Sequence, residues 1–337
     1  MEKAWSMNDA SPQPAIQQGR WLKFASNRPM SLGVQLPRTH PKPFDQIGKG
    51  PDGWSAGEGF PELVAKAKLA LEVGFDMLWV PDHMILDVEE DHVNLRGVWD
   101  CWTLMAGLAA ALPGTPIGPM VACTGFHNPG SIAKMAETLD SISQGNFVLG
   151  LGCGWHKPEY DMFGFPFDHR VDRFSEALPI ISSLVRTGRA SLEGDYYQAR
   201  DAVNFPRGPR WQEGGPPILL GAKAPRMMRL TALYADAWNA DWLLDPELFT
   251  PMMNDLDAAC ESVGRDPSTL VRSSSGRYAM SDEVEPWSAI HGTPEEMATT
   301  MIRFAELGSK HHVISTDPRV PSSLEKFAKV IELYDRG

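Results

Sequence analysis

A histidine directly follows an aspartate at the end of a short apolar segment, Trp79–His83. An imidazole exchanges protons near neutral pH, so His83 at a strand end suits acid–base work or a hydrogen bond to a bound cofactor. A structural histidine whose ring only satisfies its neighbours explains this position equally well. His83 is therefore a candidate catalytic residue that needs support from other parts of the chain.

Three glycines alternate with other residues between Gly150 and Gly154. Glycine has no side chain and lets the backbone approach a flat ligand closely, although this spacing alone is a weak signal. The aromatic residues that follow either pack a loop or form the wall of a planar cofactor site. They are Trp155, Tyr160, Phe163, Phe165 and Phe167.

Small residues lead from another apolar segment into a predicted helix at Gly221–Arg226. The free N–H groups of a helix N-terminus attract anions, and Lys223 and Arg226 add positive charge. A plain turn with solvated basic side chains is the alternative. We favour phosphate binding at this turn.

Two other residues near strand ends have simpler interpretations. Asn128 precedes Pro129 and is predicted as a helix cap, with a binding role as the alternative. Cys123 is predicted as a small buried residue, because nothing near it marks a base that would make its thiol a nucleophile.

A metal site is the main rival chemistry. Asp82–His83, Asp91–His92 and His311–His312 supply possible ligands. His311 and His312 would point to opposite faces of a strand, so they could not bind one ion together. The chain also contains neither a His-x-His nor a His-Glu-x-x-His motif. We therefore predict no metal site.

The segments that must position these residues have the composition of buried parallel strands, and predicted helices separate them. They are residues 31–36, 76–80, 117–122, 147–151, 217–220, 237–240, 270–277 and 311–315. Eight alternating units without a change in composition favour an α/β fold, a single (β/α)8 TIM barrel with loop insertions. A doubly wound sheet is the alternative, but it needs a glycine-rich turn after its first strand, and Pro37–His40 is not one.

Helix boundaries and insertions complete this prediction. Apolar residues share one helical face in residues 131–142 and 171–187, Thr293 begins a capping box, and the last helix is expected near residues 322–334. Long segments follow three strands, which would place them at the mouth of the barrel: residues 37–57, 152–170 and 278–292. Residues 188–215 are predicted to hold a hairpin. We predict a flexible leader over residues 1–30 and one barrel domain over residues 31–337.

Composition narrows the classes of partner. The 337 residues carry a net charge of −12, which disfavours nucleic acid and anionic membrane surfaces as main partners. No apolar run is long enough for a membrane span, and the N-terminus lacks the order of a signal peptide. The four cysteines are dispersed without a C-x-x-C motif, which fits a cytoplasmic protein without disulfides.

The chain resembles the bacterial-luciferase-like superfamily of flavin- and deazaflavin-dependent oxidoreductases. The resemblance runs from about residue 31 to about residue 335, with matching stretches in the same order and at similar spacing. These stretches are residues 79–83, 126–129, 133–140, 143–147, 150–159, 163–167, 234–239 and 292–296.

The resemblance implies a barrel that holds an isoalloxazine ring at its C-terminal mouth. It places Asp82 and His83 beside the reactive ring, and it places a non-proline cis peptide bond, which backs the ring, at Met120–Val121. The residues implied to bind the cofactor are Asp82, His83, Met120, Val121, Asn128, Gly152, Cys153, Trp155, Gly221, Ala222 and Lys223, the last three at its phosphate.

One departure from the family pattern bears on the reaction. Sugar-phosphate dehydrogenases of this superfamily that use a deazaflavin have a glutamate proton donor where this chain has Trp155, and the nearest carboxylate is Glu159. The residues by which luciferase itself binds phosphate are also missing. We assign His83, Trp155 and Glu159 as candidate catalytic residues, with Trp155, Phe163 and residues 37–57 expected to shape the substrate cavity.

The predicted function is that of a two-component flavin-dependent monooxygenase that uses reduced FMN and O2 on a small organic substrate. A separate flavin reductase would supply the reduced FMN, and a homodimer is expected from the resemblance. A hydride-transferring oxidoreductase that uses coenzyme F420 is the alternative, and a non-catalytic flavin-binding protein is a further one.

Overall fold

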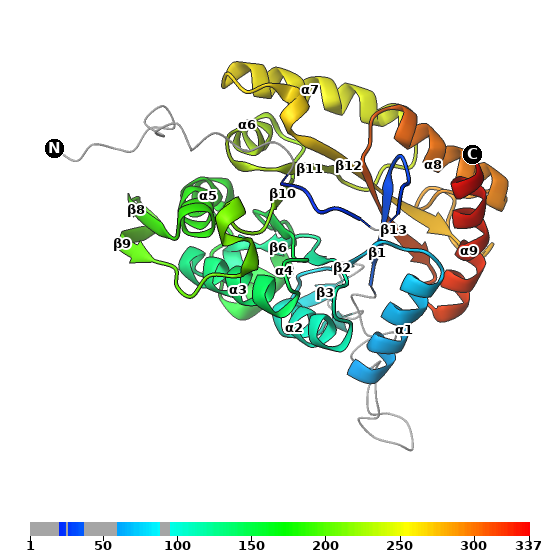
Figure 1. Ribbon diagram of the computed structural model, residues 1–337, viewed down its shortest axis with the longest axis horizontal. Helices are drawn as coiled ribbons and strands as arrows, with labels where there is room; N and C mark the ends of the chain where they lie inside the picture. Colours follow the sequence, from blue (N-terminus) through cyan, green and yellow to red (C-terminus); the bar gives the residue numbers. More distant parts are fainter. Residues whose placement is uncertain (1–19, 25, 37–58, 88–94) are drawn as a thin grey trace.

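The computed structural model describes residues 20–24, 26–36, 59–87 and 95–337. Nine parallel strands form one sheet in the order β5-β2-β1-β13-β12-β11-β10-β7-β6. Both ends of this order, β5 (Ile117–Pro119) and β6 (Ala122–Cys123), belong to the single strand predicted over residues 117–122. The sheet therefore closes on itself, which confirms the predicted (β/α)8 barrel (Figure 1).

The strands lie close to their predicted positions. The other seven are β1 (Ser31–Gln35), β2 (Met77–Val80), β7 (Leu149–Gly152), β10 (Ile218–Gly221), β11 (Ala237–Ala240), β12 (Val271–Ala279) and β13 (His311–Asp317). The one difference is the third predicted strand, which is interrupted at Met120–Val121 by a non-proline cis peptide bond. This is the position at which the resemblance implied such a bond.

Helices surround the barrel (Figure 1). They are α1 (Phe60–Glu72), α2 (Cys101–Ala111), α3 (Pro129–Ile142), α4 (Lys157–Phe163), α5 (Arg170–Thr187), α6 (Pro225–Tyr234), α7 (Phe249–Ser262), α8 (Pro294–Glu306) and α9 (Pro321–Arg336). The predicted capping box is present, because Glu296 N–H donates to the Thr293 hydroxyl and Thr293 N–H donates to the Glu296 carboxylate. Within the described residues, no helix is long and apolar enough to cross a membrane.

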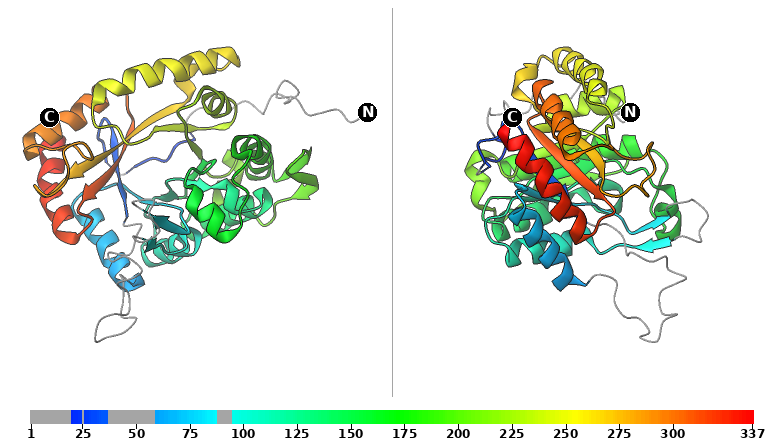
Figure 2. Two further views of the ribbon diagram at one scale, coloured as in Figure 1. Left: turned by 180° about the vertical axis from the view of Figure 1, so that it is seen from behind. Right: turned by 90° about the vertical axis from the view of Figure 1, so that its right-hand side faces the viewer.

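Two antiparallel hairpins are added to the barrel. The predicted hairpin between residues 188 and 215 consists of β8 (Arg189–Glu193) and β9 (Gln198–Val203), and Figure 2 shows it beside α5 at the edge of the molecule. The second pairs β3 (Ile85–Asp87) with β4 (Leu95–Gly97), directly after His83. This second hairpin was not predicted from the sequence.

The barrel interior is filled, so a ligand can enter only near the mouth. Trp79 donates its indole N–H to His311 Nε2 at 2.8 Å across the interior. A Cβ at Gly33 would lie only 2.4 Å from Trp79, which explains why this inward position of β1 has no side chain. Burial lowers the pKa of His311 to about 3, so this histidine is a neutral structural group.

Residues before β1 close the opposite end of the barrel. The Phe24 ring stacks on His311, with 5.5 Å between the ring centroids, and Leu22 is buried in the interior cluster. Arg20 is buried as well, and its Nε lies 3.0 Å from Asp236 Oδ1. The expected flexible leader over residues 1–30 is thus corrected from residue 20 onward, whereas residues 1–19 and 25 lie outside the described residues.

Candidate active site

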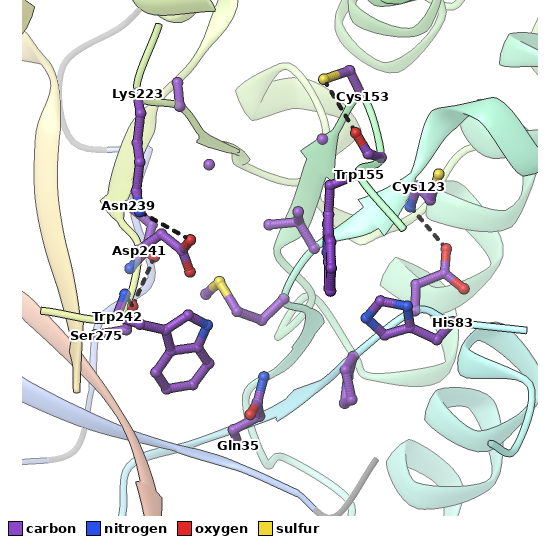
Figure 3. Close-up of a pocket in the computed structure, with 18 of the residues that line it drawn as sticks. Gln35, His83, Cys123, Cys153, Trp155, Lys223, Asn239, Asp241, Trp242 and Ser275 are labelled. Atoms are coloured by element: carbon purple, nitrogen blue, oxygen red, sulfur yellow. Dashed lines mark hydrogen bonds and ion pairs between the residues drawn. The ribbon is translucent and has the colours of Figure 1, made fainter. Parts of the chain in front are cut away.

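A cavity of about 540 Å³ opens at the C-terminal ends of the strands. Of the residues assigned as catalytic or as cofactor-binding, all except Asn128 line it: Asp82, His83, Met120, Val121, Gly152, Cys153, Trp155, Glu159, Gly221, Ala222 and Lys223. Figure 3 shows His83 and Lys223 at opposite ends of this cavity. The topology therefore brings together residues from four separate parts of the chain.

Two other predicted residues, Asn128 and Phe163, do not line the cavity in the described structure. Asn128 is exposed, and its Oδ1 accepts the Gly130 N–H at 2.9 Å, so it is the helix cap of α3. Phe163 ends α4 with half of its side chain exposed, away from the cavity lining. The expected covering loop over residues 37–57 lies outside the described residues.

The bend between β5 and β6 forms an apolar wall of the cavity. Met120 and Val121 both line it, and β7 lies directly behind them. A Cβ at Gly150 would lie 2.1 Å from the Pro119 carbonyl oxygen, and a Cβ at Gly152 would lie 2.8 Å from Val121. The alternating glycines are thus required by the neighbouring strand, which the bend brings close.

His83 contacts a carboxylate that is 76 residues away in the sequence. Its Nδ1 lies 2.9 Å from Glu159 Oε1, and the other carboxylate oxygen accepts the Met84 N–H at 2.8 Å. Glu159 is almost fully buried in α4, and the Trp155 ring stands edge-on to His83 at 5.9 Å. The second strand and the aromatic segment after the fourth strand therefore form one polar cluster.

Asp82 has a different environment from its neighbour. It is 7% exposed, and its Oδ2 accepts the Cys123 N–H at 2.9 Å. Burial raises the pKa of the Asp82 carboxyl to about 7, and the nearby carboxylates of Asp100 and Glu159 add to this rise. Asp82 thus anchors the loop after the bend and lies next to, not against, the His83 ring.

Cys123 is a structural residue, as its sequence position suggested. Its Sγ lies 2.9 Å from the Tyr160 hydroxyl, and burial raises the pKa of the thiol to about 12. A thiol in this state is a poor nucleophile because almost none of it is ionised at neutral pH.

The predicted phosphate turn lies at the other end of the cavity. It runs from the end of β10 into α6, whose first residue is Pro225 and whose N-cap, Ala224, offers no side-chain cap. Lys223 lies 3.3 Å from Asp241 at the surface. Arg226 does not line the cavity, because it pairs with Asp172 and donates to the Ser175 hydroxyl at 3.1 Å.

Several lining residues were not found by sequence analysis. They extend from the inner faces of β1, β11 and β12 and from the loop after β11: Gln35, Asn239, Asp241, Trp242, Ser275 and Arg277. The available signal was a polar residue inside an otherwise apolar strand end, as at Gln35. Ser275 donates to Asn239 Oδ1 at 3.2 Å, whereas the buried Gln35 Oε1 and Arg277 Nε have no hydrogen-bond partner among the described residues.

Groups of three or more His, Cys, Asp or Glu that could hold a metal are absent from the described residues. His311 and His312 are both buried and hydrogen-bonded, and they occupy opposite faces of β13, as predicted. His311 bonds Trp79 and Ser31, whereas His312 bonds Ser274 and Tyr278. The pair Asp91–His92 lies outside the described residues.

A closed parallel barrel with a polar and apolar cavity at the C-terminal ends of its strands is the architecture of (β/α)8 enzymes. The chain belongs to the luciferase-like monooxygenase family, whose sequence profile matches residues 42–290. This confirms the superfamily that the motifs indicated.

Individual relatives divide between two chemistries. The pyrimidine monooxygenase RutA of Methylorubrum extorquens is 31% identical over 265 residues, which cover 73% of this chain and 65% of that protein. The chain thus spans just under two thirds of the length of this relative. Among solved structures, an F420-dependent secondary alcohol dehydrogenase has a TM-score of 0.73 at 18% identity, covering 90% of this chain and 99% of the other. The EDTA monooxygenase of Chelativorans sp. BNC1 has a TM-score of 0.72 at 14% identity, covering 91% of this chain and 94% of the other, so both share the fold.

Proposed function

We propose that this chain is the oxygenase component of a two-component flavin-dependent monooxygenase, which uses reduced FMN and O2 on a small organic substrate. The observation that carries the proposal is a single cavity that contains three features. These are the apolar wall at Met120–Val121, the His83–Glu159 pair and the turn Gly221–Lys223, which leads into the uncapped N-terminus of α6. The family membership and the monooxygenase relative support the same reaction.

The residues present fit an isoalloxazine ring with a phosphate tail. The apolar wall offers a flat surface, and the buried Gln35 Oε1 has no hydrogen-bond partner, which suits the N–H of an imide. The N–H groups at the start of α6 suit a phosphate, with Gly221, Ala222 and Lys223 around it. When bound, reduced FMN supplies the electrons that activate O2.

The residues of the protein would position the cofactor and the substrate, exclude water and provide a group that exchanges a proton. Trp155 and Trp242 line the cavity, and we expect them to cover the bound cofactor against water. His83 lies where it can accept or donate a proton at its ring nitrogen inside the cavity. The substrate is proposed to lie in the remaining space beside His83.

Coenzyme F420 is the alternative cofactor, with hydride transfer in place of oxygenation. Its tail continues beyond the phosphate with several carboxylates, which favour a basic exit groove. In the described structure, Lys223 pairs with Asp241 and Arg226 pairs with Asp172, so both basic side chains at the turn have acidic partners. This pairing supports FMN over F420.

A titration separates the alternatives. Reduced FMN and reduced F420 are added to the protein without O2 at one ionic strength, and we expect the tighter binding for FMN. The FMN complex is then mixed with 18O2 and a pyrimidine such as uracil, chosen because of the monooxygenase relative. Label in the product supports the proposal. Tighter binding of F420 with reduction of a candidate substrate would overturn it, and hydrogen peroxide as the sole product across a panel of small organic compounds would favour a flavin-binding protein.

We further propose a separate flavin reductase as partner, a homodimer and a cytoplasmic location. The reductase follows from the two-component reaction, and the homodimer from the family resemblance alone. All four cysteines are free thiols, and three of them are buried, which supports a reducing compartment.

A further inference from the structure

The contact between His83 and Glu159 defines which ring nitrogen faces the cavity. Nδ1 lies 2.9 Å from Glu159 Oε1, so Nε2 is the nitrogen that remains for a ligand. Figure 3 shows the His83 ring directed into the cavity beside Trp155. A carboxylate can only accept hydrogen bonds, so this contact requires the hydrogen to be on Nδ1.

The backbone holds the carboxylate in this orientation. Glu159 Oε2 accepts the Met84 N–H at 2.8 Å and lies 3.5 Å from the Ile85 N–H. These two N–H groups begin the β3 hairpin, so the residues that follow His83 also fix its partner. The side chain of Glu159 is 3% exposed and that of His83 is 10% exposed, so few water molecules compete for the contact.

Side chains next to His83 limit which other groups it can contact and how its ring can be oriented. The rings of Trp155 and His156 stand nearly perpendicular to the His83 ring, at 5.9 Å and 6.2 Å. Asp82, the carboxyl next to His83 in sequence, bonds the Cys123 N–H instead. The histidine is therefore paired with a distant carboxylate although an adjacent one exists.

We propose that Glu159 is a positioning residue, which holds His83 in the form with hydrogen on Nδ1 so that Nε2 is a proton acceptor inside the cavity. When Nε2 takes one proton from a group in the cavity, the ring becomes an imidazolium beside the Glu159 carboxylate. The pair is then neutral overall, which lowers the cost of a buried cation. Returning the proton from Nε2 restores the starting state.

The role in turnover rests on the proposed function, but the position of the hydrogen does not. It is measured in the protein without substrate by 15N NMR of the histidine ring nitrogens, at a pH where the ring is neutral. The His83→Asn variant identifies the two resonances by their loss. We expect Nδ1 to give the shift of a protonated nitrogen and Nε2 that of an unprotonated one. The reverse result in the unmodified protein would overturn the proposal.

The Glu159→Gln substitution should invert this pattern. The glutamine oxygen must face the Met84 N–H, because an amide N–H there would oppose another donor. Its NH2 group then donates to Nδ1 and moves the ring hydrogen to Nε2. The matched control is Asp161→Asn, which removes a charge from the same helix at a side chain that is 59% exposed and pairs with Lys157. The control should leave both His83 resonances unchanged.

Two further measurements complete the test. Thermal unfolding shows whether Glu159→Gln remains folded, and the result on the unmodified protein stands if it does not. In turnover with reduced FMN and O2, we expect Glu159→Gln to lower kcat at least tenfold while the Kd of FMN stays within about a factor of two. Inverted resonances with unchanged kcat would refute the proton role. Absence of turnover in the unmodified protein would refute the proposed function alone, since the ring shifts need no reaction.

Discussion

The uncapped start of α6 allows one substitution to change protein stability and cofactor affinity in opposite directions. Ala224 is the N-cap of this helix, with an extended backbone (φ −76°, ψ 148°) and no side-chain hydrogen bond. Pro225 follows and has no N–H, so the donors at this end are those of the next residues. Aspartate in place of Ala224 has the right backbone conformation to accept one of them.

For the protein without ligand, Ala224→Asp should be stabilising. A new N-cap is worth about 0.5–2 kcal/mol, and its negative charge lies at the positive end of the helix. For a bound phosphate the effect is opposite, because the carboxylate occupies the same donors. Two charges about 5 Å apart repel by about 1–3 kcal/mol at an effective dielectric constant between about 20 and 80, which is about 5- to 150-fold in Kd.

The assay compares two ligands and two variants. Denaturant unfolding gives the free energy of unfolding, and fluorescence titration gives the Kd of FMN and of riboflavin, which has no phosphate. Ala224→Ser is the matched control, because serine caps the helix without adding charge. We expect both variants to be more stable, and we expect Ala224→Asp to lose much more FMN affinity than Ala224→Ser because only aspartate adds charge, with riboflavin affected much less by either. An equal loss for both ligands, or no loss for FMN, would show that the phosphate does not bind at α6.

Four other predictions concern single side chains. His83→Asn should keep cofactor affinity and lose at least tenfold in turnover, and turnover within a factor of two would remove His83 from the mechanism. Gln35→Leu should raise the free energy of unfolding by about 1 kcal/mol, because it removes a buried acceptor that has no partner among the described residues. The same substitution should weaken FMN binding, and unchanged FMN affinity would argue against a contact between Gln35 and the cofactor. Burial raises the pKa of the Asp82 carboxyl to about 7, above its value in the unfolded chain. The unmodified protein should therefore become less stable as the pH rises from about 4 to 7, because over this range the carboxyl is ionised in the unfolded chain but keeps its proton in the fold. Unfolding experiments should show a smaller loss of stability over the same range for Asp82→Asn. Asp236→Asn should lower the free energy of unfolding by about 3–5 kcal/mol, because it leaves the buried Arg20 and Arg186 without their carboxylate. A loss below about 1 kcal/mol in denaturant unfolding would contradict the buried ion-pair network.

Much of the barrel could be predicted because its strands are buried on both faces. Such strands are short apolar runs between helix signals, and β11 lies at the predicted residues 237–240. The packing of residues 20–24 against the barrel was not predicted, because this segment lacks such a pattern. Trp21, Leu22 and Phe24 occupy the bottom of the barrel, but a run of five residues with two basic side chains has no helical or strand period to detect.

The site was only partly predictable from the sequence. His83 and Gly221–Lys223 follow strands and carry recognisable chemistry, so they could be selected one by one. Gln35 could not, because its role depends on facing inward at the mouth without a partner, and only the closed barrel shows this. The partner of His83 was likewise hidden, since Glu159 lies 76 residues further along the chain.

The placement of Glu159 bears on the choice of cofactor. From the sequence, Trp155 at the position of a proton-donating glutamate favours oxygenation, because the nearest carboxylate, Glu159, lies four residues further on. The structure places Glu159 against His83 in the same cavity, so a carboxylate–histidine pair is present whichever cofactor binds. Trp155 therefore does not exclude hydride chemistry. The proposal of FMN over F420 rests instead on the turn after β10, where Lys223 and Arg226 are paired with acidic side chains. We expect this pairing to disfavour a longer tail of carboxylates. Substitutions at that turn, such as Ala224→Asp, thus test the cofactor more directly than any substitution near His83.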